Sequence, residues 1–325
     1  MHLLLQRQRD RGRTPASLRA IFGIAVSASI LTLASGCNKT TTDEARASSQ
    51  TSLAGKPRAL MFIFGDRGDP RVLPIATLAN GEIKPITLDS AGWRNFDRLY
   101  FAAGNKLPVY ANGKSFGDAV VRRGMWDEKT PLYKLPACRA LRPLAAATLD
   151  STPEAAVMLE MLAVSDPFPT SPVRPLIVPS DVDSARAVTI RVAQHEGLTS
   201  SARAELDEVL KPFYTGVSTH PTLVGSYLER GSGLNGKPRH VFMIADWLDA
   251  SNGYVQTFVH VPADSAREFR RLIDHADFTG DGVDEIVLEG WTPGSDSFLI
   301  FLQYKGGHWR EAARGANSWC ADQKD

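Results

Sequence analysis

A short segment near the C-terminal end of the chain combines acids and glycines at a spacing suited to binding a hard cation. It reads Asp277-Phe278-Thr279-Gly280-Asp281-Gly282-Val283-Asp284-Glu285. Calcium takes six to eight oxygen ligands at about 2.3–2.6 Å, and alternate residues of a tight loop can present oxygens to one centre. Gly282 permits a sharp turn that other residues resist. The segment therefore predicts either a calcium site or a metal-free Asp-Gly turn before a strand.

This segment resembles the D-x-D/N-x-D-G-x-x-D/E loop of the FG-GAP and VCBS repeats of integrin-type propellers, which also occurs singly in exported bacterial proteins. The resemblance is confined to this loop. It implies that Ca²⁺ would be bound by the side chains of Asp277, Thr279, Asp281 and Glu285 and by the carbonyl of Val283. Thr279 departs from the family's pattern, which has Asp or Asn there, and is a weaker ligand. Leu288 stands where an EF-hand loop has its bidentate acid, so the loop is not an EF-hand.

Cys37 is the second residue whose surroundings indicate chemistry. A basic stretch with five arginines precedes an uncharged run from Ala20 to Gly36, and Ala34-Ser35-Gly36 stands directly before the cysteine. These are the regions of a secretory signal, and the junction resembles the lipobox of bacterial lipoproteins. The resemblance implies cleavage before Cys37 and a diacylglycerol on its sulfur, although the family prefers leucine at the position of Ala34. Ordinary signal-peptidase cleavage and an uncleaved anchor are the alternatives.

The resemblance divides the N-terminal part into a signal peptide, residues 1–36, and a lipidated cysteine with a flexible tether, residues 37–56. The tether is rich in Thr, Ser, Ala and charge and has no apolar period, as is typical of linkers. In enterobacterial lipoproteins an Asp after the cysteine retains the protein at the inner membrane. Asn38 stands there instead, which favours an outer-membrane location, on its periplasmic or surface face.

Charge and cysteine content fit an exported protein. The 325 residues carry a formal charge of +1, which falls to −3 without residues 1–36. A mildly acidic mature chain offers no electrostatic footprint for nucleic acid, so we expect none as a partner. If Cys37 is acylated, Cys138 and Cys320 remain as a pair in an oxidising compartment, either as a disulfide or as two buried thiols.

Residues 57–170 are predicted to be rich in β-strands. Short apolar runs such as Leu60–Phe64 and Leu99–Phe101 have strand length, and Asn80-Gly81 and Asn112-Gly113 are typical hairpin turns. The run from Ala156 to Val164 fits either a strand or a buried helix.

Residues 171–325 are predicted to be an α+β region that carries the calcium loop, with the option that both regions form one compact unit. Apolar spacing indicates one helix from Ser180 to Gly197 and a second from Thr199 to Pro212, packed as a hairpin on a sheet. Strand-length segments follow from Pro221 onward. The fold class expected is α+β, mostly antiparallel β with a central helical hairpin. His275 is expected to be structural, as a lone His on a strand usually is.

Two classes of function are compatible with these features. The first is a non-enzymatic envelope lipoprotein, a binding or scaffolding module with a structural calcium, anchored by Cys37 to the lipid membrane and contacting an envelope protein or polysaccharide. It is favoured because the sequence has no complete catalytic constellation, so no catalytic residue is assigned. The alternative is an envelope-polymer hydrolase that uses carboxylate catalysis, since paired acids can come from anywhere in a fold.

Overall fold

A computed structural model describes residues 57–125, 144–150, 158–167, 174–198, 206–229, 239–263, 268–292 and 297–315. The chain divides into two compact units, Met1–Ala54 and Gly55–Asp325, and all described residues belong to the second. The signal peptide, the tether and all three cysteines, Cys37, Cys138 and Cys320, lie outside the described residues. None of the helices in the described ranges is long and apolar enough to cross a membrane.

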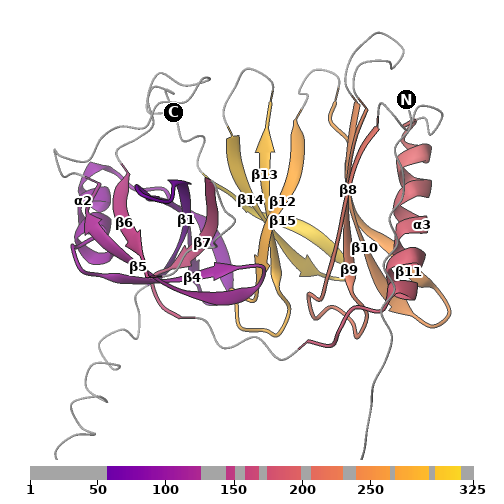
Figure 1. Ribbon diagram of the computed structural model, residues 1–325, viewed down its shortest axis with the longest axis horizontal. Helices are drawn as coiled ribbons and strands as arrows, with labels where there is room; N and C mark the ends of the chain where they lie inside the picture. Colours follow the sequence, from indigo (N-terminus) through magenta and orange to yellow (C-terminus); the bar gives the residue numbers. More distant parts are fainter. Residues whose placement is uncertain are drawn as a thin grey trace, which may run out of the picture. The chain divides into compact units, whose positions relative to one another are not determined.

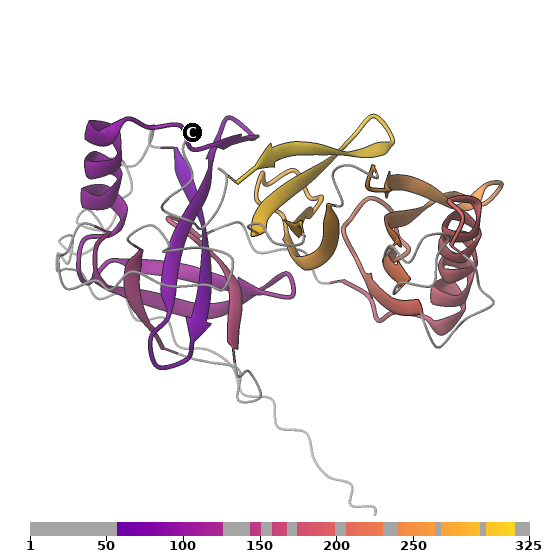
Figure 2. The same ribbon diagram turned by 90° about the horizontal axis from the view of Figure 1, so that it is seen from above.

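The first part of this unit is a closed β-barrel, visible in Figure 2. Its strands are β1 (Arg58–Asp66), β2 (Arg71–Ala79), β3 (Glu82–Pro85), β4 (Lys106–Ala111), β5 (Lys114–Arg123), β6 (Ala145–Leu149) and β7 (Met158–Val164). They are ordered β1-β7-β4-β5-β6-β2-β3, and β1 also pairs with β2. The added pairing closes six strands into a barrel and leaves β3 as an extension of β2.

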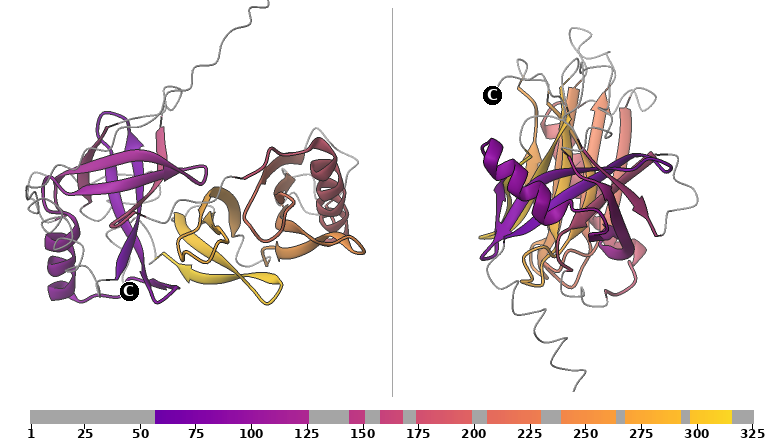
Figure 3. Two further views of the ribbon diagram at one scale, coloured as in Figure 1. Left: turned by 90° about the horizontal axis from the view of Figure 1, so that it is seen from below. Right: turned by 90° about the vertical axis from the view of Figure 1, so that its left-hand side faces the viewer.

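Helix α2 (Ser90–Tyr100) packs against the core of the barrel and is seen at its side in Figure 3. The carboxylate of Asp89 accepts the Gly92 N–H at 2.7 Å and so caps the first turn. Phe96 is buried, and Trp93 and Tyr100 pack beside it at helical spacing. The expected strand at Leu99–Phe101 is therefore wrong, because Leu99 and Tyr100 form the last turn of α2. The Asp89 cap starts this helix, and the aromatic residues at helical spacing continue it to Tyr100.

Two four-stranded antiparallel sheets make up the rest. The first, ordered β11-β10-β9-β8, contains β8 (Leu206–Phe213), β9 (Thr222–Glu229), β10 (Arg239–Asp249) and β11 (Gly253–His260). Helix α3 (Pro179–His195) contacts β9, β10 and β11 and covers one face of this sheet (Figure 1). The second, ordered β12-β13-β14-β15, contains β12 (Phe269–Ala276), β13 (Glu285–Trp291), β14 (Ser297–Lys305) and β15 (His308–Arg314).

The apolar cores show which faces are buried. On β1, Ala59, Met61 and Ile63 belong to the barrel interior, whereas the alternating residues belong to a second core shared with the β12–β15 sheet. The other face of that sheet packs against the β8–β11 sheet, with Phe242, Leu288 and Ile300 among the buried residues. The β12–β15 sheet is thus buried on both faces.

The fold is mostly antiparallel β with two helices in the described residues, and the expected helical hairpin is not found. Helix α3 confirms the first helix of the hairpin. The second is wrong over residues 206–213, which form β8 and pair with β9 from Leu206↔Glu229 to Phe213↔Thr222. The sheet offers these residues a full hydrogen-bond ladder, which outweighs their helical spacing of apolar residues. Pro212 is tolerated because β8 is an edge strand.

Candidate functional site

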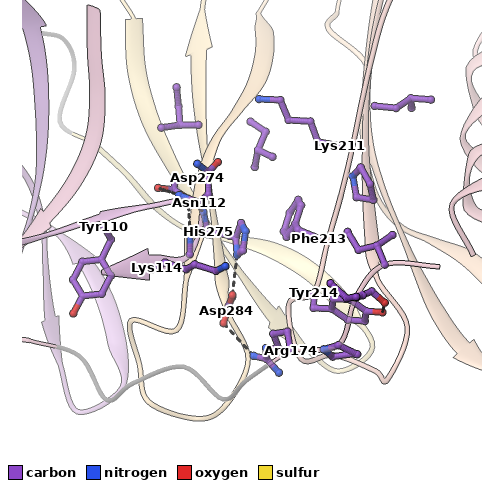
Figure 4. Close-up of a pocket in the computed structure, with 18 of the residues that line it drawn as sticks. Tyr110, Asn112, Lys114, Arg174, Lys211, Phe213, Tyr214, Asp274, His275 and Asp284 are labelled. Carbon is purple, nitrogen blue, oxygen red and sulfur yellow. Dashed lines mark hydrogen bonds and ion pairs between the residues drawn. The ribbon is translucent and has the colours of Figure 1, made fainter. Parts of the chain in front are cut away.

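A pocket in the described part of the chain lies where the edge strands of the two sheets meet the barrel. Its volume is about 880 Å³, and its walls come from the β4–β5 turn, the segment before α3, the end of β8 and the second half of β12. Figure 4 shows the polar side chains that face this space. The lining residues that bear charge or carry an imidazole are Lys114, Arg174, Lys211, Asp274, His275 and Asp284.

The β4–β5 turn is held in the pocket wall by a carboxylate of β12. Asn112 and Gly113 have φ angles of 52° and 71°, as a two-residue hairpin of this type requires. Asp274 accepts the N–H groups of both residues at 3.1 Å. Burial raises the pKa of Asp274, and these backbone hydrogen bonds partly offset that effect. The carboxylate is therefore committed to positioning the turn.

His275 lies between this turn and the end of β8. Its ring stacks on Phe213 with centroids 4.1 Å apart and an interplanar angle of 16°. On the turn side, a Cβ placed on Gly113 would stand 2.6 Å from the imidazole Cε1. Glycine is required at that position both for its positive φ and for this close approach.

A chain of polar contacts continues from His275 to the segment before α3. Nδ1 of His275 is 2.8 Å from Oδ2 of Asp284, and Arg174 donates to Oδ1 of the same carboxylate at 3.2 Å. Both contacts are drawn in Figure 4. Asp284 is buried. Its negative charge is matched by the guanidinium of Arg174, which also donates to the carbonyl of Gly282.

The two lysines of the pocket differ from its acids, because no described residue pairs with them as an opposite charge. Lys114 and Lys211 are exposed, and among the described residues no carboxylate lies within ion-pair distance of either. Asp274 and Asp284, in contrast, accept all their hydrogen bonds from the protein itself. Among the described residues of the pocket, the charge without an ion-pair partner is positive.

The remaining wall is apolar. It is formed by Pro175, Leu176, Ile177, Leu210, Pro212, Phe213, Leu272 and Ile273, with the rings of Tyr110 and Tyr214. Phe213 and Leu272 belong to the core between the two sheets, so the apolar wall is continuous with that core. Leu176 is 91% exposed, which places a large aliphatic side chain at the mouth of the pocket.

The predicted calcium loop joins β12 to β13 beside this pocket. Gly280 and Gly282 have φ angles of 78° and 89°, in agreement with the tight loop expected there. Asp277 accepts the N–H groups of Gly280, Asp281 and Gly282, at 2.6, 3.1 and 2.9 Å. Asp281 accepts the N–H of Val283 at 2.9 Å. The carboxylates thus hold the turn through backbone hydrogen bonds.

Glu285, at the start of β13, is the most buried of the expected ligands. It accepts the Phe278 N–H at 2.8 Å, the Thr279 hydroxyl at 2.9 Å and the Gln303 amide at 3.2 Å. Burial raises the pKa of Glu285 to about 7 and also raises that of Asp277. In the described part of the chain no three acidic, His or Cys side chains are grouped as metal ligands would be.

The pocket was not predictable from the sequence. His275 was expected to be structural, and no role was expected for Lys114, Arg174, Lys211 or Asp284. These residues are spread over more than 160 positions and share no motif, so only the packing of the sheets brings them together. Only the β4–β5 turn was indicated by neighbouring residues, through the Asn112-Gly113 pair that is typical of hairpins.

The chain was compared with known proteins at three levels. No protein-family model matches the chain, and the searches of curated proteins and of solved structures find no match either.

Proposed function

We propose that this protein is a binding module of the cell envelope that holds a small anionic ligand in the pocket between β8, β12 and the β4–β5 turn. The observation that carries the proposal is the pairing of charges. The acids that line the pocket are satisfied by Arg174, His275 and backbone amides, whereas Lys114 and Lys211 are not paired with any described carboxylate.

The dimensions of the pocket support this proposal. A volume of about 880 Å³ is in the range of small-molecule sites, which are mainly apolar with a few positioned polar groups. One part of the wall is fixed before a ligand arrives, because His275 is held by Asp284 and by its stack on Phe213. A rigid wall lowers the entropy lost on binding.

The alternative function, a hydrolase with paired carboxylates, receives less support from the same geometry. Such an enzyme needs two carboxyl groups that face the substrate with one held protonated. The two carboxylates in this pocket are occupied: Asp274 holds the turn, and Asp284 is bonded to Arg174 and His275. We therefore favour binding over carboxylate catalysis.

The location and the metal remain proposals that rest on the sequence. The Ala34-Ser35-Gly36-Cys37 junction supports export and a lipid anchor, and Asn38 favours the outer membrane. A calcium ion bound by the loop from Asp277 to Glu285 is supported by the resemblance and by the tight conformation of this loop. Because the loop already satisfies its carboxylates with backbone N–H groups, a bound cation has to compete with them, and we expect weak affinity.

A fluorescence titration of the purified protein with anilinonaphthalenesulfonate, an anionic apolar probe, tests the binding proposal. Each exposed ion pair contributes roughly 0.2–1 kcal/mol, so Lys114→Gln and Lys211→Gln should each weaken binding by up to about fivefold, and the effect should shrink at high salt. Lys305→Gln, at an exposed lysine outside the pocket, is the matched control. Equal binding by the double lysine variant and the control would refute the proposal.

A further inference from the structure

We infer that the pocket takes a single-chain amphiphile, a linear aliphatic chain that ends in a carboxylate. This inference rests on the proposed function, since it names the ligand class of the same pocket. Its first support is the position of the pocket at the edge strands β8 and β12 of two sheets that pack face to face. Phe213 and Leu272 line the pocket and also belong to the core between these sheets.

The second support is the distribution of exposed apolar side chains. Among the described residues eight large hydrophobic side chains are exposed, and three of them are consecutive: Leu176, Ile177 and Val178, at 91%, 38% and 50%. Leu176 and Ile177 line the pocket, and Val209, at 50%, precedes the lining residue Leu210. Exposed apolar residues that cluster at one site indicate a surface that an apolar partner covers.

The third support is the separation of Lys114 from this apolar rim. Lys114 lies next to the β4–β5 turn, whereas Leu176 and Ile177 precede α3, so this lysine and the exposed aliphatic side chains come from different segments. A carboxylate head placed at Lys114 or Lys211 gains a charge-assisted contact. The aliphatic chain then lies along the apolar wall, where each buried methylene contributes through removal of its surface from water.

Competition against the sulfonate probe by hexanoate, octanoate, decanoate and dodecanoate, all below their micelle concentrations, tests the inference. Each added methylene that is buried should tighten binding roughly fourfold. Dodecyltrimethylammonium, which has the same chain and the opposite charge, should compete at least about tenfold more weakly than dodecanoate. Ile177→Asp should weaken decanoate binding about tenfold, whereas Val261→Asp, at a 42% exposed residue that does not line the pocket, should change it less than twofold.

The outcomes separate this inference from the function on which it rests. Lysine-dependent binding of the probe without any gain in competition along the alkanoate series would overturn the amphiphile and leave the anion pocket standing. Equal competition by the cationic amphiphile would also overturn it. Loss of lysine dependence for the probe itself would remove the binding function and this inference together. The chain-length series uses the unaltered protein, so a folding defect in the Ile177→Asp protein leaves the test intact.

Discussion

Two Asn-Gly turns in the barrel differ in one respect that can be measured. Gly81 and Gly113 have similar φ angles, 74° and 71°, and each follows an Asn with positive φ. A Cβ on Gly81 would meet nothing within 4 Å, whereas a Cβ on Gly113 would stand 2.6 Å from Cε1 and 2.9 Å from Nδ1 of His275. The pair Gly81→Ala and Gly113→Ala therefore separates backbone strain from the contact with the pocket wall.

The expected losses of stability follow from these contacts. Gly81→Ala suffers only the left-handed backbone penalty of about 1–2 kcal/mol, which a lower entropy of the unfolded chain reduces to about 1 kcal/mol. Gly113→Ala has the same penalty and must also displace the imidazole or retract the turn. Retraction of the turn would remove two N–H donors from the buried carboxylate of Asp274. The steric conflict between the added methyl group and the imidazole is a case of overpacking, which costs about 1–3 kcal/mol. We expect a total loss of about 2–4 kcal/mol.

Urea unfolding followed by tryptophan fluorescence gives the free energy of unfolding of both variants, and probe titration shows the state of the pocket. Gly113→Ala should be about 1–3 kcal/mol less stable than Gly81→Ala and should bind the sulfonate probe more weakly. Equal losses of unfolding free energy in the two variants would show that the β4–β5 turn does not contact His275. The described wall of the pocket would then be wrong.

Four further outcomes are expected. Cys37→Ser should move the protein to the soluble fraction or leave an unprocessed precursor, and unchanged membrane association with normal processing would contradict lipidation. Mass spectrometry of the non-reduced protein should show two hydrogens fewer if Cys138 and Cys320 are bonded; two alkylatable thiols would exclude the bond. Millimolar calcium should raise the melting temperature, with a Kd near 10⁻⁴–10⁻³ M, and Asp281→Ala should abolish the rise; an unmoved melting curve would leave the loop a simple turn. Burial lowers the pKa of His240 to about 4. Below about pH 6.5 the unfolded chain therefore binds a proton at this residue that the native state does not bind, and the free energy of unfolding should fall by roughly 3 kcal/mol between pH 6.5 and 4. A His240→Gln protein with the same pH dependence as the unaltered chain would contradict this.

The structural basis of the His240 prediction is an interaction that joins the two sheets. Nδ1 lies 3.0 Å from the carbonyl of Tyr227 on β9, and Nε2 accepts the N–H of Arg270 on β12 at 3.0 Å. A proton on Nε2 would turn this acceptor into a donor that faces another donor. His260 and Arg270 add positive charge nearby and lower the pKa further.

Features whose causes lie within a few residues were predictable from the sequence. The Asn80-Gly81 and Asn112-Gly113 turns were expected from residue type, since these residues enter the left-handed region more readily than most, and both adopt positive φ. Helix α3 was expected from its apolar spacing, and the strand at Leu60–Phe64 from its apolar run. The loop from Asp277 to Glu285 forms as a tight turn because its carboxylates reach backbone N–H groups only a few positions away.

Tertiary structure decided the features whose partners are distant in the chain. Residues 206–213 have apolar residues at helical spacing, yet they form β8 because the edge of β9 supplies a hydrogen-bond ladder that an isolated segment lacks. The pocket is a stronger case, since Asp274 meets the turn at Asn112 across 162 residues and Asp284 meets Arg174 across 110. Local dihedral preferences carry no information about such pairs. The side chains that line the pocket are brought together by the packing of two sheets and a barrel. This packing depends on which faces are buried, and so on the whole chain.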